Sequence, residues 1–186
     1  MSKFTIGVVV GSVRKGSINQ KLADALAKLA GADFDFRAVK IDDLPLYNQD
    51  LDTDTPPESV ARLRSEVRAL DGFLFVTPEY NRTIPPLLAN ALHWASRPYG
   101  KNSWVGKPGA LTGASIGPVG TGGAQGALRD LLGVLDIRLI GQPEAYVHVK
   151  DGTFAEDGSI ADEGLKRLLQ TKIDTFTAWV AQVSGK

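Results

Sequence analysis

The sequence predicts an α/β protein with a parallel, doubly wound sheet. Five apolar segments of strand-like composition alternate with segments in which apolar residues recur at helical spacing. Strands separated by helices are typical of a parallel sheet with helices on both faces. A strand order of 2-1-3-4-5 fits this pattern, although periodicity alone does not fix the order. A length of 186 residues without internal repeat or linker predicts one domain over residues 1–186.

The expected strands differ in how deeply they are buried in the sheet. Residues 4–10 and 72–77 are continuously apolar, which is typical of strands buried on both faces. The 34–41 segment alternates and predicts a less buried outer strand, whose inward side chains are Phe34, Phe36, Ala38 and Ile41. The remaining strands are expected at 108–114 and in a fifth region, 138–141 with 145–149, which is broken near Pro143.

The expected helices follow from apolar spacing and from start signals. They lie over 17–30, after Thr55, from Pro85 to about Ser96, after the glycine-rich loop 117–126, and over 162–183. Thr55 is expected as the N-cap of the second helix, with Pro56 in its first turn and Glu58 as capping-box partner.

Composition and charge exclude several classes of protein. Lysine plus arginine and aspartate plus glutamate both number 21, and this zero net charge argues against a nucleic-acid binder. The chain has no cysteine and two histidines, His93 and His148, so thiolate chemistry and a histidine-rich metal site are not expected. Residues 1–3 show no signal-peptide pattern, and no apolar run approaches the roughly 20 residues that span a membrane. We therefore expect no membrane partner and a cytoplasmic location.

The segment 11–19, Gly-Ser-Val-Arg-Lys-Gly-Ser-Ile-Asn, follows the first strand and opens a helix. Hydroxyl, amide and guanidinium groups gather where a helix N-terminus also favours an anion. The segment matches neither a Walker loop nor a GxGxxG fingerprint, which disfavours nucleoside triphosphates and directly bound dinucleotides. The alternative is a capping box of Ser17 and Gln20 with a solvated Arg14. The position after the first strand favours phosphate binding.

The segment 77–81, Thr-Pro-Glu-Tyr-Asn, ends the third strand at the same edge of the sheet. Pro78 cannot continue a strand ladder, so the following backbone N–H groups and the Asn81 amide can reach a flat heterocycle. Glu79 resembles an acid–base group. An exposed or structurally paired carboxylate is the favoured interpretation.

A glycine-rich loop, 115–123, follows the fourth strand and allows close approach of the backbone to a ligand. Alone, it is equally compatible with a flexible connector. Ligands of open parallel sheets bind beyond the carboxyl ends of the strands, so the three loops are expected to converge. A phosphate loop beside a ring-binding turn favours a phosphate-tailed, ring-headed cofactor, with FMN as first candidate.

With these motifs the chain resembles the NADPH-dependent FMN reductase family, and within it the quinone and chromate reductases. The family loop G-S-x-R-x-x-S-x-N is matched at 11–19, and its P-E-Y-N segment with a proline-led helix is matched at 78–86. Further matches lie at 44–48 and 90–98. The chain departs from the family at His93, where aspartate is frequent, and near Gln125, where arginine is expected.

The resemblance implies a flavodoxin-like fold, non-covalent FMN, NADPH or NADH as co-substrate, and a homodimer or homotetramer. The residues implied to hold the phosphate are Ser12, Arg14, Ser17, Ile18 and Asn19. Those implied to line the flavin ring are Pro78, Glu79, Tyr80, Asn81, Ser115 and Gly117. No catalytic side chain is implied, because FMN carries the chemistry.

The expected activity is an NAD(P)H oxidoreductase that reduces quinones, or other acceptors such as chromate, free flavin or azo compounds, by ping-pong hydride transfer. Two alternatives stay open: a flavodoxin-type electron carrier and a flavin-binding regulatory protein. Zero net charge weakens the carrier, because such carriers usually dock through acidic surfaces. The helix near 85–98 is expected at an oligomer interface, since its apolar residues spread around more than one face: Leu87, Leu88, Leu92 and Trp94.

Overall fold

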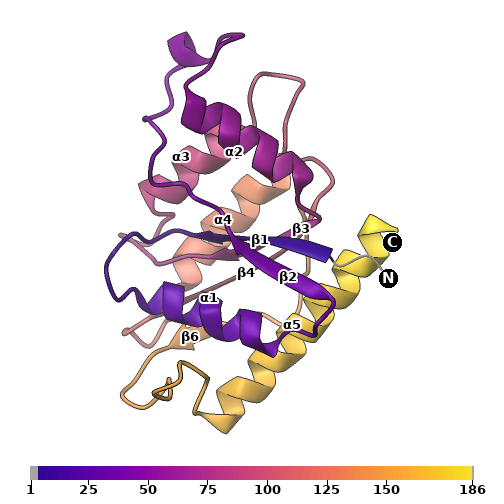
Figure 1. Ribbon diagram of the computed structural model, residues 1–186. Helices are drawn as coiled ribbons and strands as arrows, with labels where there is room; N and C mark the ends of the chain where they lie inside the picture. The colour runs from indigo at the N-terminus through magenta and orange to yellow at the C-terminus, as the bar shows by residue number, and fades with distance from the viewer. Residues whose placement is uncertain (1–3, 186) are drawn as a thin grey trace.

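A computed structural model describes residues 4–185 as a parallel sheet with helices on both faces (Figure 1). The strand order is β2-β1-β3-β4-β5, which confirms the order expected from the sequence. The strands are β1 Phe4–Val10, β2 Phe34–Ala38, β3 Gly72–Val76, β4 Pro108–Ser115 and β5 Arg138–Leu139. A short β6, Tyr146–His148, also pairs with β4, so the expected fifth region is split around Pro143. Residues 1–3, in which the sequence shows no signal-peptide pattern, lie outside the described residues, as does residue 186.

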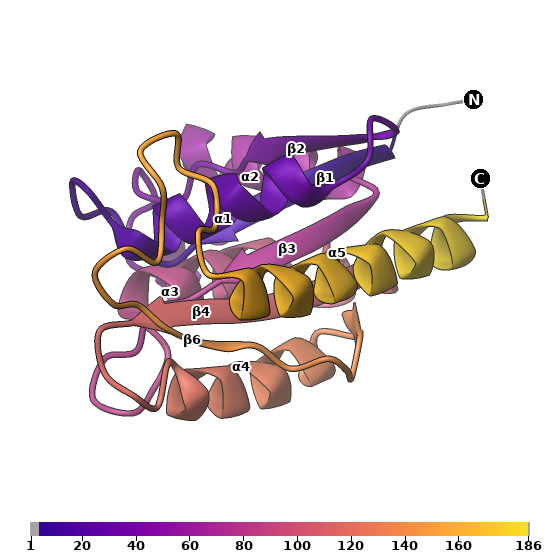
Figure 2. The same cartoon turned by 90° about the horizontal axis from the view of Figure 1, so that it is seen from below.

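The helices form two layers around the sheet (Figure 2). They are α1 Ile18–Leu29, α2 Glu58–Ala69, α3 Pro86–Ala95, α4 Gly122–Val134 and α5 Glu163–Ser184, with a 3-10 turn η1 at Gln49–Leu51. Apolar side chains of α1 and α5 pack on one face of the sheet, and those of α2, α3 and α4 pack on the other. Within residues 4–185, no helix is long and apolar enough to cross a membrane.

The start of α2 differs from the expectation. The helix begins at Glu58, and its N-cap is Pro57 without a side-chain hydrogen bond, so the prediction of Thr55 as N-cap is wrong. A proline disfavours the helical conformation of the residue before it. Pro57 therefore keeps Pro56 out of the helix.

The outer strand is also shorter than expected. Phe34 and Phe36 are partly buried, but β2 ends at Ala38, which is exposed, and the next buried residues are Val39 and Ile41. The alternation of inward and outward side chains stops where the strand stops, so Ala38 does not belong to the inward set.

The apolar surface of α3 is covered within the subunit. Leu88, Leu92 and Trp94 are fully buried. The loop after β2 lies against the helix, because Trp94 Nε1 donates to Pro45 O (2.7 Å). The segment between α3 and β4 also contacts it, because the indole of Trp104 donates to Leu92 O (3.2 Å). The sequence argument that α3 leaves apolar surface for a partner subunit therefore fails.

Candidate active site

The loops after β1, β3 and β4 converge at the carboxyl edge of the sheet, as the sequence predicts. Gly11 N donates to Val76 O (2.9 Å), and Thr77 N donates to Thr112 O (2.9 Å). A Cβ atom on Gly11 would lie 3.1 Å from Cδ of Pro78, so the first two loops are in close contact. The strand order reverses between β1 and β3, and open parallel sheets bind ligands at such a switch point.

The loop after β1 places exposed cations at the start of α1. Arg14 Nη2 donates to Gly16 O (3.3 Å), and no carboxylate in residues 4–185 pairs with Arg14 or Lys15. Ser17 is the N-cap, and its Oγ accepts a hydrogen bond from Gln20 N (3.3 Å). The first-turn N–H groups of Ile18 and Asn19 have no partner within the helix. This segment can therefore bind an anion.

The side chain of Asn19 is used by the fold. It is buried, its Nδ2 donates to Ala114 O (2.9 Å), and its Oδ1 accepts from Ala114 N (2.9 Å). These two bonds tie the start of α1 to the end of β4. Asn19 thus offers a ligand its backbone N–H in place of the side-chain amide that the sequence suggested.

Ser12 follows Gly11 in the loop after β1. It lines a small cavity of about 120 Å³ between β1 and β2, together with Val13, Gln20 and Lys40. Ser12 therefore lies beside the start of α1 and the residues that follow β2.

The segment after β3 forms a tight turn. Tyr80 and Thr83 exchange two backbone hydrogen bonds (3.2 and 3.0 Å), and between them Asn81 and Arg82 have φ of 51° and 64°. Two consecutive residues with positive φ are typical of a type I′ hairpin turn. Tyr80 and Asn81 are exposed on this turn. Sequence reasoning did not find the turn, because neither central residue is glycine.

Glu79 precedes this turn and contacts the first turn of α4. Its Oε2 accepts a hydrogen bond from Ala124 N (3.0 Å), and its Oε1 lies 3.3 Å from Arg82 Nη1. These contacts agree with the interpretation of Glu79 as a structurally paired carboxylate.

The loop after β4 is held by the Ser115 hydroxyl. Ser115 Oγ accepts from Gly117 N (3.2 Å) and lies within hydrogen-bond distance of Gly120 O (2.6 Å). Ser115 and Gly117 line a cavity of about 280 Å³, which the turn after β3 also lines through Glu79 and Arg82. The two ring-side segments named from the sequence therefore share one cavity.

Gln125 also lies in this region. The sequence singles it out only because arginine is expected near this position in the family. It is fully buried in the first turn of α4, where its Nε2 donates to Thr121 Oγ1 and to Ala145 O (3.0 Å each). It links the loop after β4 to the segment that leads into β6. Because its partner Ala145 is 20 residues away, local sequence patterns could not reveal this role.

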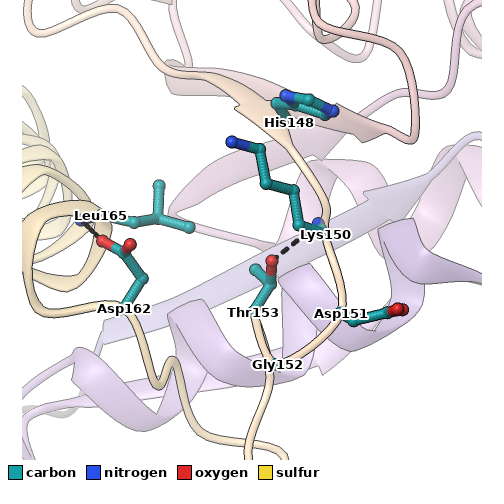
Figure 3. A pocket seen from close by; sticks show the side chains of 7 residues that line it. All are labelled: His148, Lys150, Asp151, Gly152, Thr153, Asp162 and Leu165. Carbon is teal, nitrogen blue, oxygen red and sulfur yellow. Dashed lines mark hydrogen bonds between the residues drawn. The ribbon is translucent and has the colours of Figure 1, made fainter.

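A second cavity, of about 260 Å³, follows β6 (Figure 3). Figure 3 shows Lys150 extended toward His148, with Asp151 pointing to the other side of the loop and Asp162 turned toward Leu165. His148 is the register partner of Ser115, so this cavity adjoins the loop after β4. Its lining mixes basic and acidic side chains. Within residues 4–185, no group of three or more histidine, aspartate or glutamate side chains is arranged to hold a metal ion.

Comparisons with known proteins agree with this geometry. A family model described as NADPH-dependent FMN reductase matches residues 4–151. A 2-hydroxy-1,4-benzoquinone reductase from Burkholderia sp is 49% identical over 175 residues, which cover 94% of this chain and 95% of that protein. A quinone reductase from Pseudomonas putida is 44% identical over 177 residues, which cover 95% of each chain. The structure of FerB, a flavoenzyme NAD(P)H:(acceptor) oxidoreductase from Paracoccus denitrificans, matches with a TM-score of 0.92 and 44% identity, covering 96% of this chain and 98% of FerB. The chain belongs to the NADPH-dependent FMN reductase family.

Proposed function

We propose that this chain is an FMN-dependent NAD(P)H oxidoreductase that reduces quinones and other small acceptors. The observation that carries the proposal is the contact of the loop that leads into α1 with the segment after β3 at the switch point of the sheet. The names of its relatives, two quinone reductases and an NAD(P)H:(acceptor) oxidoreductase, support it. The proposal includes one FMN-binding domain over residues 1–186 and a cytoplasmic location, where reduced nicotinamide dinucleotides are available.

The donor set after β1 fits the phosphate of FMN. Arg14 is exposed and has no carboxylate partner within residues 4–185, and Ile18 and Asn19 present first-turn N–H groups. We assign the phosphate to these three residues together with Ser12 and Ser17. The Asn19 side chain acts indirectly, by fixing α1 against β4.

The ring side of FMN is assigned to the cavity between the turn after β3 and the loop after β4. The residues are Pro78, Glu79, Tyr80, Asn81, Ser115 and Gly117. Backbone polar groups of a turn and a glycine-containing loop suit the carbonyls and nitrogens of a flat heterocycle. Bound FMN supplies the acceptance and delivery of hydride, and no side chain is assigned as catalytic. The chain binds the phosphate, orients the ring and leaves the exposed Tyr80–Asn81 side of the turn open to solvent.

NADPH or NADH and the acceptor are proposed to use the same open side in turn, which is a ping-pong scheme. Chromate, free flavin and azo compounds are further acceptors within the proposal. We also propose a homodimer or homotetramer, which is supported by exposed apolar side chains at Leu46, Tyr99, Val105 and Val134.

The test is the absorption spectrum of the FMN-reconstituted protein before and after anaerobic NADPH, followed by turnover with a small quinone. We expect one FMN per chain, loss of the oxidised flavin band on NADPH addition, and parallel double-reciprocal lines when NAD(P)H and quinone are varied.

Three outcomes would contradict parts of the proposal. Failure to bind FMN, or recovery of FAD, would overturn the cofactor assignment. Binding without reduction by NAD(P)H, or reduction without turnover, would favour the electron carrier or the regulatory protein. Intersecting lines with a demonstrable ternary complex would reject the shared site.

A further inference from the structure

Glu79 lines the ring-side cavity, and its carboxylate joins the turn after β3 to the start of α4. It accepts a hydrogen bond from Ala124 N (3.0 Å) in the first turn of α4, and it contacts Arg82 (3.3 Å) in its own turn. The Glu79 side chain is only 12% exposed, whereas that of Arg82 is 72% exposed. Of the two contacts of Glu79, the hydrogen bond with Ala124 is therefore less exposed to solvent than the ion pair with Arg82.

Apart from the hydrogen bond to Glu79, no side chain of residues 4–185 caps the start of α4. The N-cap Thr121 makes no side-chain capping hydrogen bond, and the first turn of α4 contains no acidic residue. The first N–H groups of a helix have no partner within the helix, and the positive end of its dipole favours a negative charge. Glu79, which lies 45 residues before Ala124, provides both the hydrogen-bond acceptor and the negative charge.

The backbones of the two segments are also in close approach. A Cβ atom on Gly123 would lie 2.9 Å from Arg82 O and 3.1 Å from Glu79 Oε2. Only glycine leaves room for the turn at Asn81 and Arg82 to lie against the first turn of α4. The position of the turn therefore depends on two features. One is the hydrogen bond that Glu79 accepts from Ala124 N, and the other is the absence of a side chain at Gly123.

We propose that Glu79 is a positioning residue that clamps the turn after β3 onto the N-terminus of α4 and thereby sets the shape of the flavin site. The inference rests on the proposed function. The Glu79 side chain acts through Ala124 N, so it is not assigned to the reaction itself. Its negative charge has a second effect: reduction adds electrons to the bound flavin, and a nearby carboxylate makes that addition harder.

The first experiment measures amide hydrogen exchange over residues 122–125 in the FMN-free protein. Glu79→Ala removes the acceptor, and exchange there should become about tenfold faster or more. Glu79→Gln retains an oxygen that can accept from Ala124 N, so exchange should stay close to that of the unmodified protein. Unchanged exchange in Glu79→Ala, or equally fast exchange in both variants, would overturn the clamp.

A second pair of variants tests the clamp without altering Glu79. Gly123→Ala pushes against Arg82 O and should also speed exchange at residues 122–125. Gly126→Ala is the matched control, because its Cβ would meet open space on the same helix and alanine favours helix formation. Equal exchange rates at residues 122–125 in the two glycine variants would contradict the argument that the two backbones lie in close approach.

The last readouts concern bound FMN. Glu79→Ala and Gly123→Ala should weaken FMN binding by about tenfold or more, and Glu79→Gln by no more than about threefold. Glu79→Gln should also shift the reduction potential of bound FMN to a more positive value, which a purely structural role would not do. An unshifted potential would reject the charge effect. If the unmodified protein bound no FMN, the proposed function would fail, while hydrogen exchange would still report on the clamp.

Discussion

Arg14 and Asn19 belong to one loop-to-helix segment, yet their side chains have opposite surroundings. Arg14 is exposed and makes one long hydrogen bond to Gly16 O (3.3 Å). Asn19 is buried, and both polar atoms of its side chain bond to Ala114 (2.9 Å each). At the scale of single residues, the first side chain is available to a ligand and the second is engaged by the fold.

Arg14→Ala should therefore weaken FMN binding and leave stability nearly unchanged. A hydrogen bond to a charged group contributes about 1.5–3 kcal/mol, which is about 10- to 150-fold in the dissociation constant. Turnover at saturating FMN should recover. Lys21→Ala, which removes the same charge from an exposed position in the first turn of α1, is the control and should leave the dissociation constant unchanged. A dissociation constant unaffected by Arg14→Ala would mean that Arg14 is only solvated.

Asn19→Ala is the contrasting variant at this scale. It leaves the buried N–H and C=O of Ala114 without partners, and each such group costs about 1–3 kcal/mol. Its free energy of unfolding, measured in urea, should fall by a comparable amount even without FMN.

At the scale of elements, α5 buries a lysine against the segment between β5 and β6. Lys172 is 1% exposed, and its Nζ donates to Pro143 O (2.9 Å). Burial and, to a smaller degree, the Arg129 guanidinium lower the pKa of Lys172 to about 8, while Glu144 acts in the opposite direction. The helix therefore holds an ammonium group in surroundings that disfavour its charge.

This lysine should make stability depend on pH. Its folded-state pKa of about 8 lies below the ordinary 10.5, so between these values the unfolded chain binds more protons than the folded chain. The free energy of unfolding should rise across this window as the penalty for the charge is relieved, by up to about 3 kcal/mol at about 1.4 kcal/mol per pKa unit.

Lys172→Met is the comparison, because it keeps an unbranched apolar chain and removes the titrating group. Other groups titrate equally in both proteins, so the informative quantity is the difference between their unfolding free energies at about pH 7 and about pH 10.5. The same pH dependence in both proteins would show that Lys172 does not carry the effect.

At the scale of the whole molecule, several large apolar side chains are exposed in or beside segments that hydrogen bonds tie to the rest of the fold. Leu46 follows Pro45, which accepts from Trp94, and Asn102 donates to Leu135 O next to Val134. Tyr99 lies on the connecting loop and is 92% exposed, and Val134 is 84% exposed. We propose that these exposed side chains, and not α3 itself, provide apolar surface for a second subunit.

Light scattering should therefore give two or four times the chain mass of 19.9 kDa. Tyr99→Ser combined with Val134→Ser should shift the protein toward smaller species, because it removes apolar contact area from the proposed interface. Val13→Ser, an exposed apolar position in the loop after β1, is the control. A fully active monomer at micromolar concentration would contradict the proposed oligomer.

The segments that sequence reasoning placed correctly are those specified by local chemistry. Continuous apolar runs predicted β1 and β3, Ser17 was recognised as a helix start, and Pro78 marked the end of a strand. The site could be located for the same reason, since the ends of parallel strands must share one edge of the sheet. The role of each side chain within the site does not follow in this way, because residue type and position do not show that the Asn19 amide is bonded to Ala114 or that Ser17 Oγ accepts from Gln20 N.

The sequence by itself determined the alternation of strands and helices, the parallel sheet, and the loops that carry the site, because periodicity and turn chemistry act over a few residues. Only the tertiary structure decided that Asn19 bonds to Ala114, that Glu79 caps α4, and that α3 is covered within the subunit. These contacts join residues 95, 45 and 49 positions apart. Partners so distant leave no periodic signal in the sequence, so they become visible only when the packed chain brings them together.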